Sequence, residues 1–424
     1  MQIKLAAAKH NIGVKYDPVI LPPALKHRRF SLLWAGLMIS IAGSQMQLWA
    51  LFWHIRTLTD SPIAISMIGV VRFVPILLFS LVGGLVADLY DRRTVLFITQ
   101  TTNMLVAFAL AFLTASGRIQ LWHIYALTAV QAVAISFDMP ARQALTPNLV
   151  PRVDLPSAFS MNSIAQNVGA IVGPALSGVV ISSLGQQYTY LINAISFLAV
   201  LAALWLMGPV EQVVSEEARR RGLNLGAIRE GVHFILTRPI ILSSMILDFF
   251  ATFFSSANTL LPFVALDVLH VDVIAYGWLS AAQSIGSVTA AVIISQRAVI
   301  RRQGALLLGA VAVFGLATIL FGLSQAFALT MFALILAGAS DSVSTILRNT
   351  IRQLQTPDDM RGRMTSINQI FFAGGPQLGE IEAGLAAEAF GVPFAIFSGG
   401  VGCIAAAIFI GKRWPQLRRY NNDS

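Results

Sequence analysis

A series of twelve apolar runs, each about as long as a helix that crosses a bilayer, constrains this chain more than any other feature. About 20 consecutive apolar residues span the hydrocarbon core of a membrane as a helix. The runs cover residues 30–53, 63–87, 94–115, 121–141, 160–183, 187–208, 239–263, 276–296, 304–324, 326–347, 364–388 and 391–411. They lack the alternation of polar and apolar residues that a membrane barrel strand shows. The sequence therefore predicts an all-α integral membrane protein with twelve transmembrane helices.

The composition agrees with a chain embedded in lipid. Charged residues make up 12% of the chain, whereas a soluble domain has about 25%. A single cysteine argues against a disulfide framework or a cysteine metal cluster, so no metal site and no cofactor are expected. The six histidines are scattered, and the chain has no HExxH, no GxSxG and no phosphate-binding loop with its lysine. A polytopic membrane enzyme remains the alternative of a different class. Because such an enzyme would lack an evident reaction centre, we expect that the chain is not an enzyme.

The positive charges predict the orientation of the helices. Of the 29 Lys and Arg residues, 26 fall in the N-terminal tail, the even-numbered loops and the C-terminal tail. Short loops rich in Lys and Arg face the cytoplasm, so both termini are expected there, in a bacterial inner membrane. The same distribution explains the net charge of +9 as membrane topology, so no nucleic-acid partner is expected.

The loops also divide the runs into six and six. The longest internal connection, 209–238, contains the charged segment EEARRR and a stretch at 225–236 with the amphipathic pattern of a helix on a membrane surface. The predicted parts are a cytosolic tail at 1–29, a six-helix bundle at 30–208, a cytosolic linker at 209–238, a second six-helix bundle at 239–411 and a cytosolic tail at 412–424.

The two halves carry an internal repeat with a constant offset of 206 residues. Eight identities keep this register: Arg142 with Arg348, Pro151 with Pro357, Ser160 with Ser366, Asn162 with Asn368, and Gly169, Gly173, Gly178 and Gly185 with Gly375, Gly379, Gly384 and Gly391. Parallel repeats of this kind build one class of transporter, with a substrate site near the midplane between the halves. A channel does not need two such halves, so the repeat favours a transporter in which one half rocks against the other.

Four segments carry a resemblance to a known superfamily. Gly84, Ala87, Asp88, Arg92, Arg93 and Leu96 resemble the loop signature G-x-L-A-D-R-x-G-R-K-x-x-L of the major facilitator superfamily, from which Leu89 and Asp91 depart. Gly169, Gly173, Pro174 and Gly178 resemble the glycine-proline motif of its antiporter branch, with Ser177 in place of one glycine. The segments FDMPARQALTPNLVP and IREGVHFILTRP resemble a subgroup that contains bacterial enterobactin-type and macrolide-type exporters.

The resemblance covers essentially the whole chain and implies the major-facilitator fold of two pseudo-symmetric six-helix bundles. It implies a secondary transporter that exports a bulky small molecule, of the siderophore, macrolide or drug class, by alternating access coupled to proton entry. A lipid-translocating transporter of the same fold is the alternative. The expected partners are the substrate, protons and the lipid bilayer, and the expected functional unit is a monomer.

The resemblance also implies that the charged loop closes the cytosolic side when the protein faces outward. Asp88 is expected near the start of the eleventh helix, whose free amides favour a carboxylate, and Arg92 is expected near Asp138. The predicted gate and motif residues are Gly84, Asp88, Arg92, Arg93, Asp138, Arg142, Asp341 and Arg348. The alternative is that the arginines only orient the protein and that Asp88 is a solvated helix end.

Charges near the middle of the runs are candidates for proton coupling, because an ionisable group in hydrocarbon is costly unless it is paired or hydrated. Arg72 lies at the same depth as Glu380 and Glu382, in runs that are neighbours in this architecture. We therefore predict an ion pair between Arg72 and one of these glutamates across the halves. The alternative places Glu380 in a water-filled cavity and Arg72 against backbone carbonyls.

Asp248 stands alone in the seventh run and is the first candidate for an acid that takes up and releases a proton. Glu380 and Asp341 follow it as candidates. The alternative for Asp248 is a structural hydrogen bond with Ser243, Ser244 or another helix.

Polar and aromatic side chains in the runs are candidates for the substrate cavity. They are Gln45, Gln47, Trp49, Gln131 and Gln283. Such side chains often pack helix against helix instead. The small-residue pairs of the fifth and eleventh runs are predicted to let helices approach closely.

Overall fold

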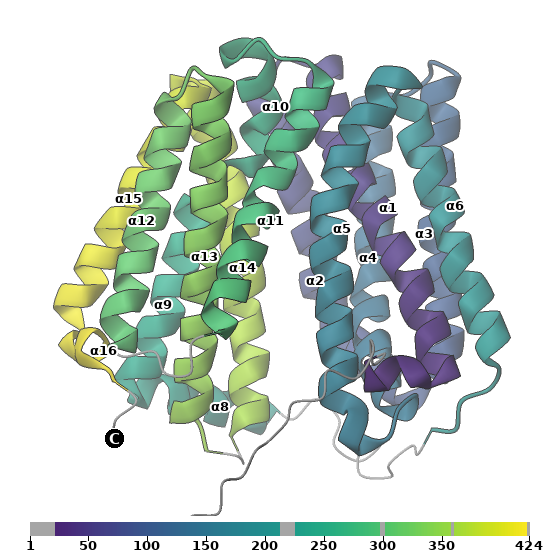
Figure 1. Ribbon diagram of the computed structural model, residues 1–424, viewed down its shortest axis with the longest axis horizontal. Helices are drawn as coiled ribbons and strands as arrows, with labels where there is room; N and C mark the ends of the chain where they lie inside the picture. Colours follow the sequence, from purple (N-terminus) through teal and green to yellow (C-terminus); the bar gives the residue numbers. More distant parts are fainter. Residues whose placement is uncertain (1–21, 213–224, 297–301, 358–359, 422–424) are drawn as a thin grey trace, which may run out of the picture.

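The computed structural model describes residues 22–212, 225–296, 302–357 and 360–421, which form helices and turns without a strand (Figure 1). The long helices are α1 (Arg28–Leu58), α2 (Pro62–Leu89), α3 (Arg92–Ala115), α4 (Leu121–Leu145), α5 (Leu155–Ser183), α6 (Gln186–Met207), α9 (Pro239–Phe254), α11 (Val273–Ser295), α12 (Gln303–Leu323), α13 (Phe327–Gln355), α14 (Arg361–Phe390) and α15 (Val392–Arg413). By length and composition, 11 spans within the described residues qualify to cross a membrane, and α14 adds a helix of 30 residues. The predicted all-α membrane class is confirmed.

Shorter elements surround these helices. They are η1 (Pro23–Lys26), η2 (Thr146–Asn148), η3 (Arg152–Asp154), α8 (Leu225–Thr237) and α16 (Pro415–Arg419). The helix α8 begins where the amphipathic stretch was predicted. Large parts of the predicted tails and linker, at 1–21, 213–224 and 422–424, lie outside the described residues.

The seventh span is interrupted, whereas the sequence predicted one continuous helix. After α9 and two serines, the span continues as η4 (Ala257–Leu260), α10 (Leu261–Phe263) and the π-helical turn η5 (Val264–Val268). The hydroxyl of Ser256 donates to the Thr252 carbonyl at 2.5 Å. Side-chain bonds of this kind compete with the backbone bonds that continue a helix.

The repeat is visible in the helix packing of each half. A side chain at Gly173 of α5 would come within 2.7 Å of the Ala42 carbonyl oxygen in α1. A side chain at Gly379 of α14 would come within 2.9 Å of the Phe253 Cα in α9. In both halves, therefore, glycine allows the fifth helix to contact the backbone of the first.

The halves contact each other through α5 with α11 and through α2 with α14. The repeat partners Gly178 and Gly384 lie in these two contacts. A side chain at Gly178 would come within 3.1 Å of the Ile274 Cα in α11, and one at Gly384 within 3.5 Å of the Ile63 Cα in α2. The third glycine of each repeat thus faces the other half.

The two ends of the molecule differ. We call the end where α1 begins and α15 ends the basic end, and the other the opposite end (Figure 1). At the opposite end one buried apolar cluster joins both halves, with Trp53 and Ile65 from one and Leu261 and Tyr276 from the other. Nearer the basic end, the large buried clusters each belong to one half. The described state is therefore closed at the opposite end.

Polar contacts reinforce this closure. Arg56 at the end of α1 donates to Asp267 at 2.7 Å, and its guanidinium lies 4.8 Å from the ring centre of Phe263. The Tyr276 hydroxyl donates to the Trp49 carbonyl at 2.9 Å. These contacts tie the end of α1 to the turns that follow α9 and to α11.

Candidate substrate cavity and charge networks

A cavity of about 750 Å³ lies inside the first half, and its wall residues fall between Leu37 and Phe197. The helices α1, α3, α4 and α5 supply most of the wall, and α2 contributes Arg72. Pockets of about 300–1,000 Å³ accommodate small-molecule ligands. The cavity is therefore large enough for a bulky small molecule.

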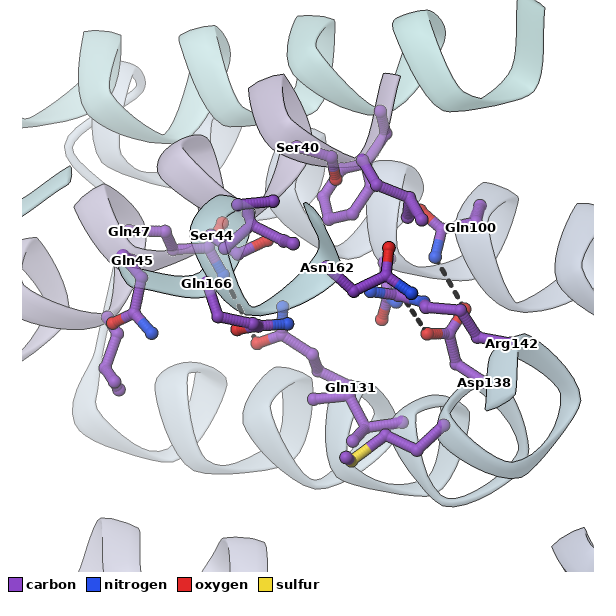
Figure 2. Close-up of a pocket in the computed structure, with 18 of the residues that line it drawn as sticks. Ser40, Ser44, Gln45, Gln47, Gln100, Gln131, Asp138, Arg142, Asn162 and Gln166 are labelled. Carbon is purple, nitrogen blue, oxygen red and sulfur yellow. Dashed lines mark hydrogen bonds and ion pairs between the residues drawn. The ribbon is translucent and has the colours of Figure 1, made fainter. Parts of the chain in front are cut away.

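Amide side chains dominate the polar part of this wall. The Gln47 amide donates to Gln131 Oε1 at 3.3 Å and accepts from Asn193 Nδ2 at 2.7 Å. Gln45 and Gln166 also line the cavity, as Figure 2 shows. Amides offer both donors and acceptors, so the wall can recognise a ligand rich in oxygen atoms.

Two predicted cavity residues lie elsewhere. Trp49 belongs to the closure at the opposite end, where its ring packs edge-on against Tyr276 at 6.3 Å. Gln283 lies in the second half, where its Oε1 accepts from Asn258 Nδ2 at 2.7 Å. Neither residue lines the large cavity. Sequence alone does not fix the rotation of a helix about its axis. It therefore could not show that Gln45 and Gln47 face the cavity whereas these two residues do not.

A carboxylate network lines the part of the cavity nearer the basic end. Asp138 is 3% exposed and forms an ion pair with Arg142 on its own helix. It also accepts from Gln100 Nε2 at 2.6 Å and from Thr99 Oγ1 at 3.0 Å, as Figure 2 shows in part. Neither α3 partner was predicted, although the polar residues at 99–103 interrupt an apolar run.

The predicted contact between Arg92 and Asp138 is wrong for this state. Arg92 instead donates to Asn148 Oδ1 at 2.8 Å and to the Ala144 carbonyl at 3.1 Å. It therefore binds the end of α4, because Asp138 already has Arg142 as its counter-ion.

The rest of the charged loop is bonded locally. Asp91, which departs from the superfamily signature, caps α3 by accepting from the Thr94 amide at 3.1 Å. Arg93 donates to the Leu204 carbonyl at 2.7 Å. Asp88 is exposed and makes no hydrogen bond or ion pair with another described residue, and a side chain at Gly84 would meet open space. The predicted gate between Asp88 and α14 thus stays a prediction for another state.

Asp248 is not isolated, contrary to the sequence interpretation. Its Oδ1 lies 3.1 Å from Arg348 Nη2, and its Oδ2 lies 3.0 Å from Arg352 Nη2. Asp341 adds a longer contact to Arg348 at 3.6 Å. Ser244 binds Arg352 rather than Asp248, through its hydroxyl at 3.1 Å. A carboxylate between two arginines, all three at 2% exposure, is a structural cross-link between α9 and α13.

The predicted ion pair between Arg72 and Glu380 is not formed between the described side chains. The Glu380 Oε2 atom is buried without a hydrogen-bond partner, and it lies 2.7 Å from the position a side chain at Gly69 would take. Arg72 faces the cavity instead. Glu382 is partly buried and makes no hydrogen bond or ion pair with another described residue.

Comparison with known proteins extends this description. Residues 21–424 match the family described as transmembrane secretion effector, MFS_3. The chain is 26% identical to the enterobactin exporter EntS of Citrobacter koseri, over 93% of this chain and 94% of that protein. It is 26% identical to the staphyloferrin A transporter of Staphylococcus aureus, over 86% of this chain and 92% of that protein. A bacterial homologue of the human lysosomal transporter Spinster, solved in an inward-facing and occupied conformation, shares the fold with a TM-score of 0.72 at 14% identity, covering 93% of this chain and 99% of that one.

Proposed function

The chain belongs to the transmembrane secretion effector family, MFS_3, and on this premise we propose that it exports a bulky small molecule by alternating access. The siderophore class is the first choice, because relatives that align over most of their length are an enterobactin exporter and a staphyloferrin A transporter. The observation that carries the proposal is the amide-lined cavity of about 750 Å³. Macrolides and other drugs of similar size are the second choice.

The proposed orientation places the basic end in the cytoplasm, in a bacterial inner membrane. The distribution of 26 of the 29 Lys and Arg residues supports it. In this orientation the described state is closed on the periplasmic side, so it is the state that receives substrate from the cell. The proposed functional unit is one chain, because residues of one half of one chain line the cavity.

The proposed energy source is proton entry, because the sequence carries no phosphate-binding loop for ATP. The test uses inverted membrane vesicles, into which an inner-membrane exporter accumulates its substrate. We expect saturable, protonophore-sensitive uptake of a catecholate or a polycarboxylate siderophore, and none in vesicles without the protein. Uptake of labelled phospholipid in place of every siderophore and macrolide would favour the lipid-translocating alternative and overturn the proposal.

The gate at the basic end yields a prediction about Asp88. The change Asp88→Asn removes the charge that would bind the exposed amides of α14 in the outward-facing state. If the outward-facing state becomes about 1 kcal/mol less stable, the export rate is expected to fall about fivefold. The amount of protein in the membrane is expected to stay the same.

The matched control is Asp91→Asn in the same loop, because asparagine also caps a helix and the charge change is identical. Initial export rates and membrane protein levels are measured side by side. Equal rates for Asp88→Asn and the wild type would remove the gate from the proposal.

A further inference from the structure

We propose that Arg72 binds an anionic group of the transported molecule and thereby selects acidic chelators over cationic drugs. The proposal rests on the proposed export function and deepens it, since it chooses among the substrate classes that function leaves open.

The charges of the cavity wall carry the argument. Among the residues that the structure describes, three charged side chains line the cavity: Arg72, Asp138 and Arg142. Asp138 and Arg142 neutralise each other in an ion pair. Arg72 makes no hydrogen bond or ion pair with another described side chain. The cavity therefore presents one guanidinium without a counter-ion in contact.

The position of Arg72 makes this charge costly. It lies ten residues into α2 from the opposite end, which is roughly 15 Å along the helix and close to the middle of a bilayer. An ionised group at that depth needs a partner or water. By the same measure Asp138 lies roughly 10 Å farther toward the basic end, where it is paired with Arg142.

The acid across the halves, Glu380, is close enough for the charge of Arg72 to act on its carboxylate, but it forms no ion pair with Arg72 in the described state. Glu380 is on α14, its Oε2 packs against Gly69, and it is absent from the cavity wall. Of the other described elements packed against α2, α1, α3 and η4 carry no acidic side chain, and α4 carries only Asp138, which is paired with Arg142. A ligand carboxylate or catecholate is therefore the group that the geometry favours beside Arg72.

The neighbouring amides suit the same ligand class. Gln45, Gln131, Asn162 and Gln166 line the wall, and their NH₂ groups can donate to the oxygen atoms of a chelator. A guanidinium binds a carboxylate in a planar, charge-assisted arrangement that lysine reproduces only as a point charge. A macrolide with a protonated amine would instead meet a like charge.

The test measures binding to the purified full chain with three probes: an iron-free polycarboxylate siderophore, an iron-free catecholate siderophore and erythromycin. The wild type is expected to bind at least one acidic probe more tightly than erythromycin. Arg72→Gln is expected to weaken acidic binding roughly 10- to 100-fold, the range of one charge-assisted contact, and Arg72→Lys is expected to restore part of it.

Two control variants keep the test decisive. Arg118→Gln removes a positive charge in a loop at the opposite end and should leave affinity unchanged. Glu380→Gln removes the nearest acid and should keep acidic binding or strengthen it. Thermal unfolding of each variant shows whether it is folded, and the pair Arg72→Gln and Arg72→Lys separates charge from folding.

The outcomes distinguish the two proposals. Tighter binding of erythromycin than of both acidic probes, or unchanged acidic binding in folded Arg72→Gln, overturns the role of Arg72 and leaves export intact. Loss of acidic binding in Glu380→Gln overturns the assignment of Arg72 as the anion site. Binding of none of the three probes by the wild type overturns both proposals.

Discussion

Replacing Asp248 by alanine is expected to destabilise the protein by about 3–5 kcal/mol, the cost of breaking a buried ion pair by removing one partner. Asp248 is shared by Arg348 and Arg352, at 3.1 and 3.0 Å. The change leaves two buried guanidinium groups without their common counter-ion. Thermal unfolding in detergent, followed by size-exclusion fluorescence, measures the effect.

The matched control is Asp341→Ala, which removes an acid from the same cluster. The Asp341 side chain is 35% exposed and lies 3.6 Å from Arg348, so a much smaller loss is expected. A second control replaces all three buried charges, with Asp248→Leu, Arg348→Met and Arg352→Met. Apolar residues of similar size are expected to recover most of the stability. Equal melting temperatures for Asp248→Ala and Asp341→Ala would contradict the cross-link.

Reversing the charge of Arg56 is expected to open the opposite end of the molecule. In the described state Arg56 contacts Asp60 and Asp267, from the two halves, and lies over Phe263. Arg56→Glu replaces these attractions by repulsion between three carboxylates. We expect the population open at this end to rise about tenfold, which corresponds to about 1.4 kcal/mol for partly exposed groups.

Distances between spin labels at Leu58 and Phe390 measure this population. Both residues are exposed, at 41% and 69%, and they lie at the ends of α1 and α14 in different halves. The single cysteine, Cys403, is buried and is replaced by alanine in the background. Arg118→Glu adds the same charge change at the same end, where its side chain forms no ion pair with described residues. A distance distribution unchanged by Arg56→Glu would mean that the apolar cluster alone holds the closure.

Much of the fold was predictable because the membrane imposes a simple rule on sequence. Apolar length defined the helices, and the long connection at 209–238 divided them into two groups of six. The break in the seventh span was not predictable, because Ser255 and Ser256 are tolerated inside apolar runs. The tenth span extends to Gln355, beyond its predicted end at 347, because Arg348 and Arg352 are buried inside the helix rather than ending it. Their charges are compensated by Asp248, a residue about 100 positions earlier in the chain.

The candidate site was predictable only in part, for a related reason. Gln45, Gln47 and Gln131 were identified as polar residues in apolar helices, and they line the cavity. Which side of a helix faces the cavity depends on contacts with helices distant in sequence. The same limit applies to Asp248, whose partners lie on α13 and whose depth alone suggested isolation.

The confinement of the cavity to residues between Leu37 and Phe197 has a consequence for engineering this transporter. If the second half serves mainly to move against the first, the residues that select the substrate and the residues that couple transport to its energy source lie in different halves of the chain. A chimera that joins the first six helices of one secretion effector to the last six of another should inherit its cargo from the first parent. The recombination point is the linker between α6 and α8, where the exchange disturbs neither cavity wall nor buried ion cluster.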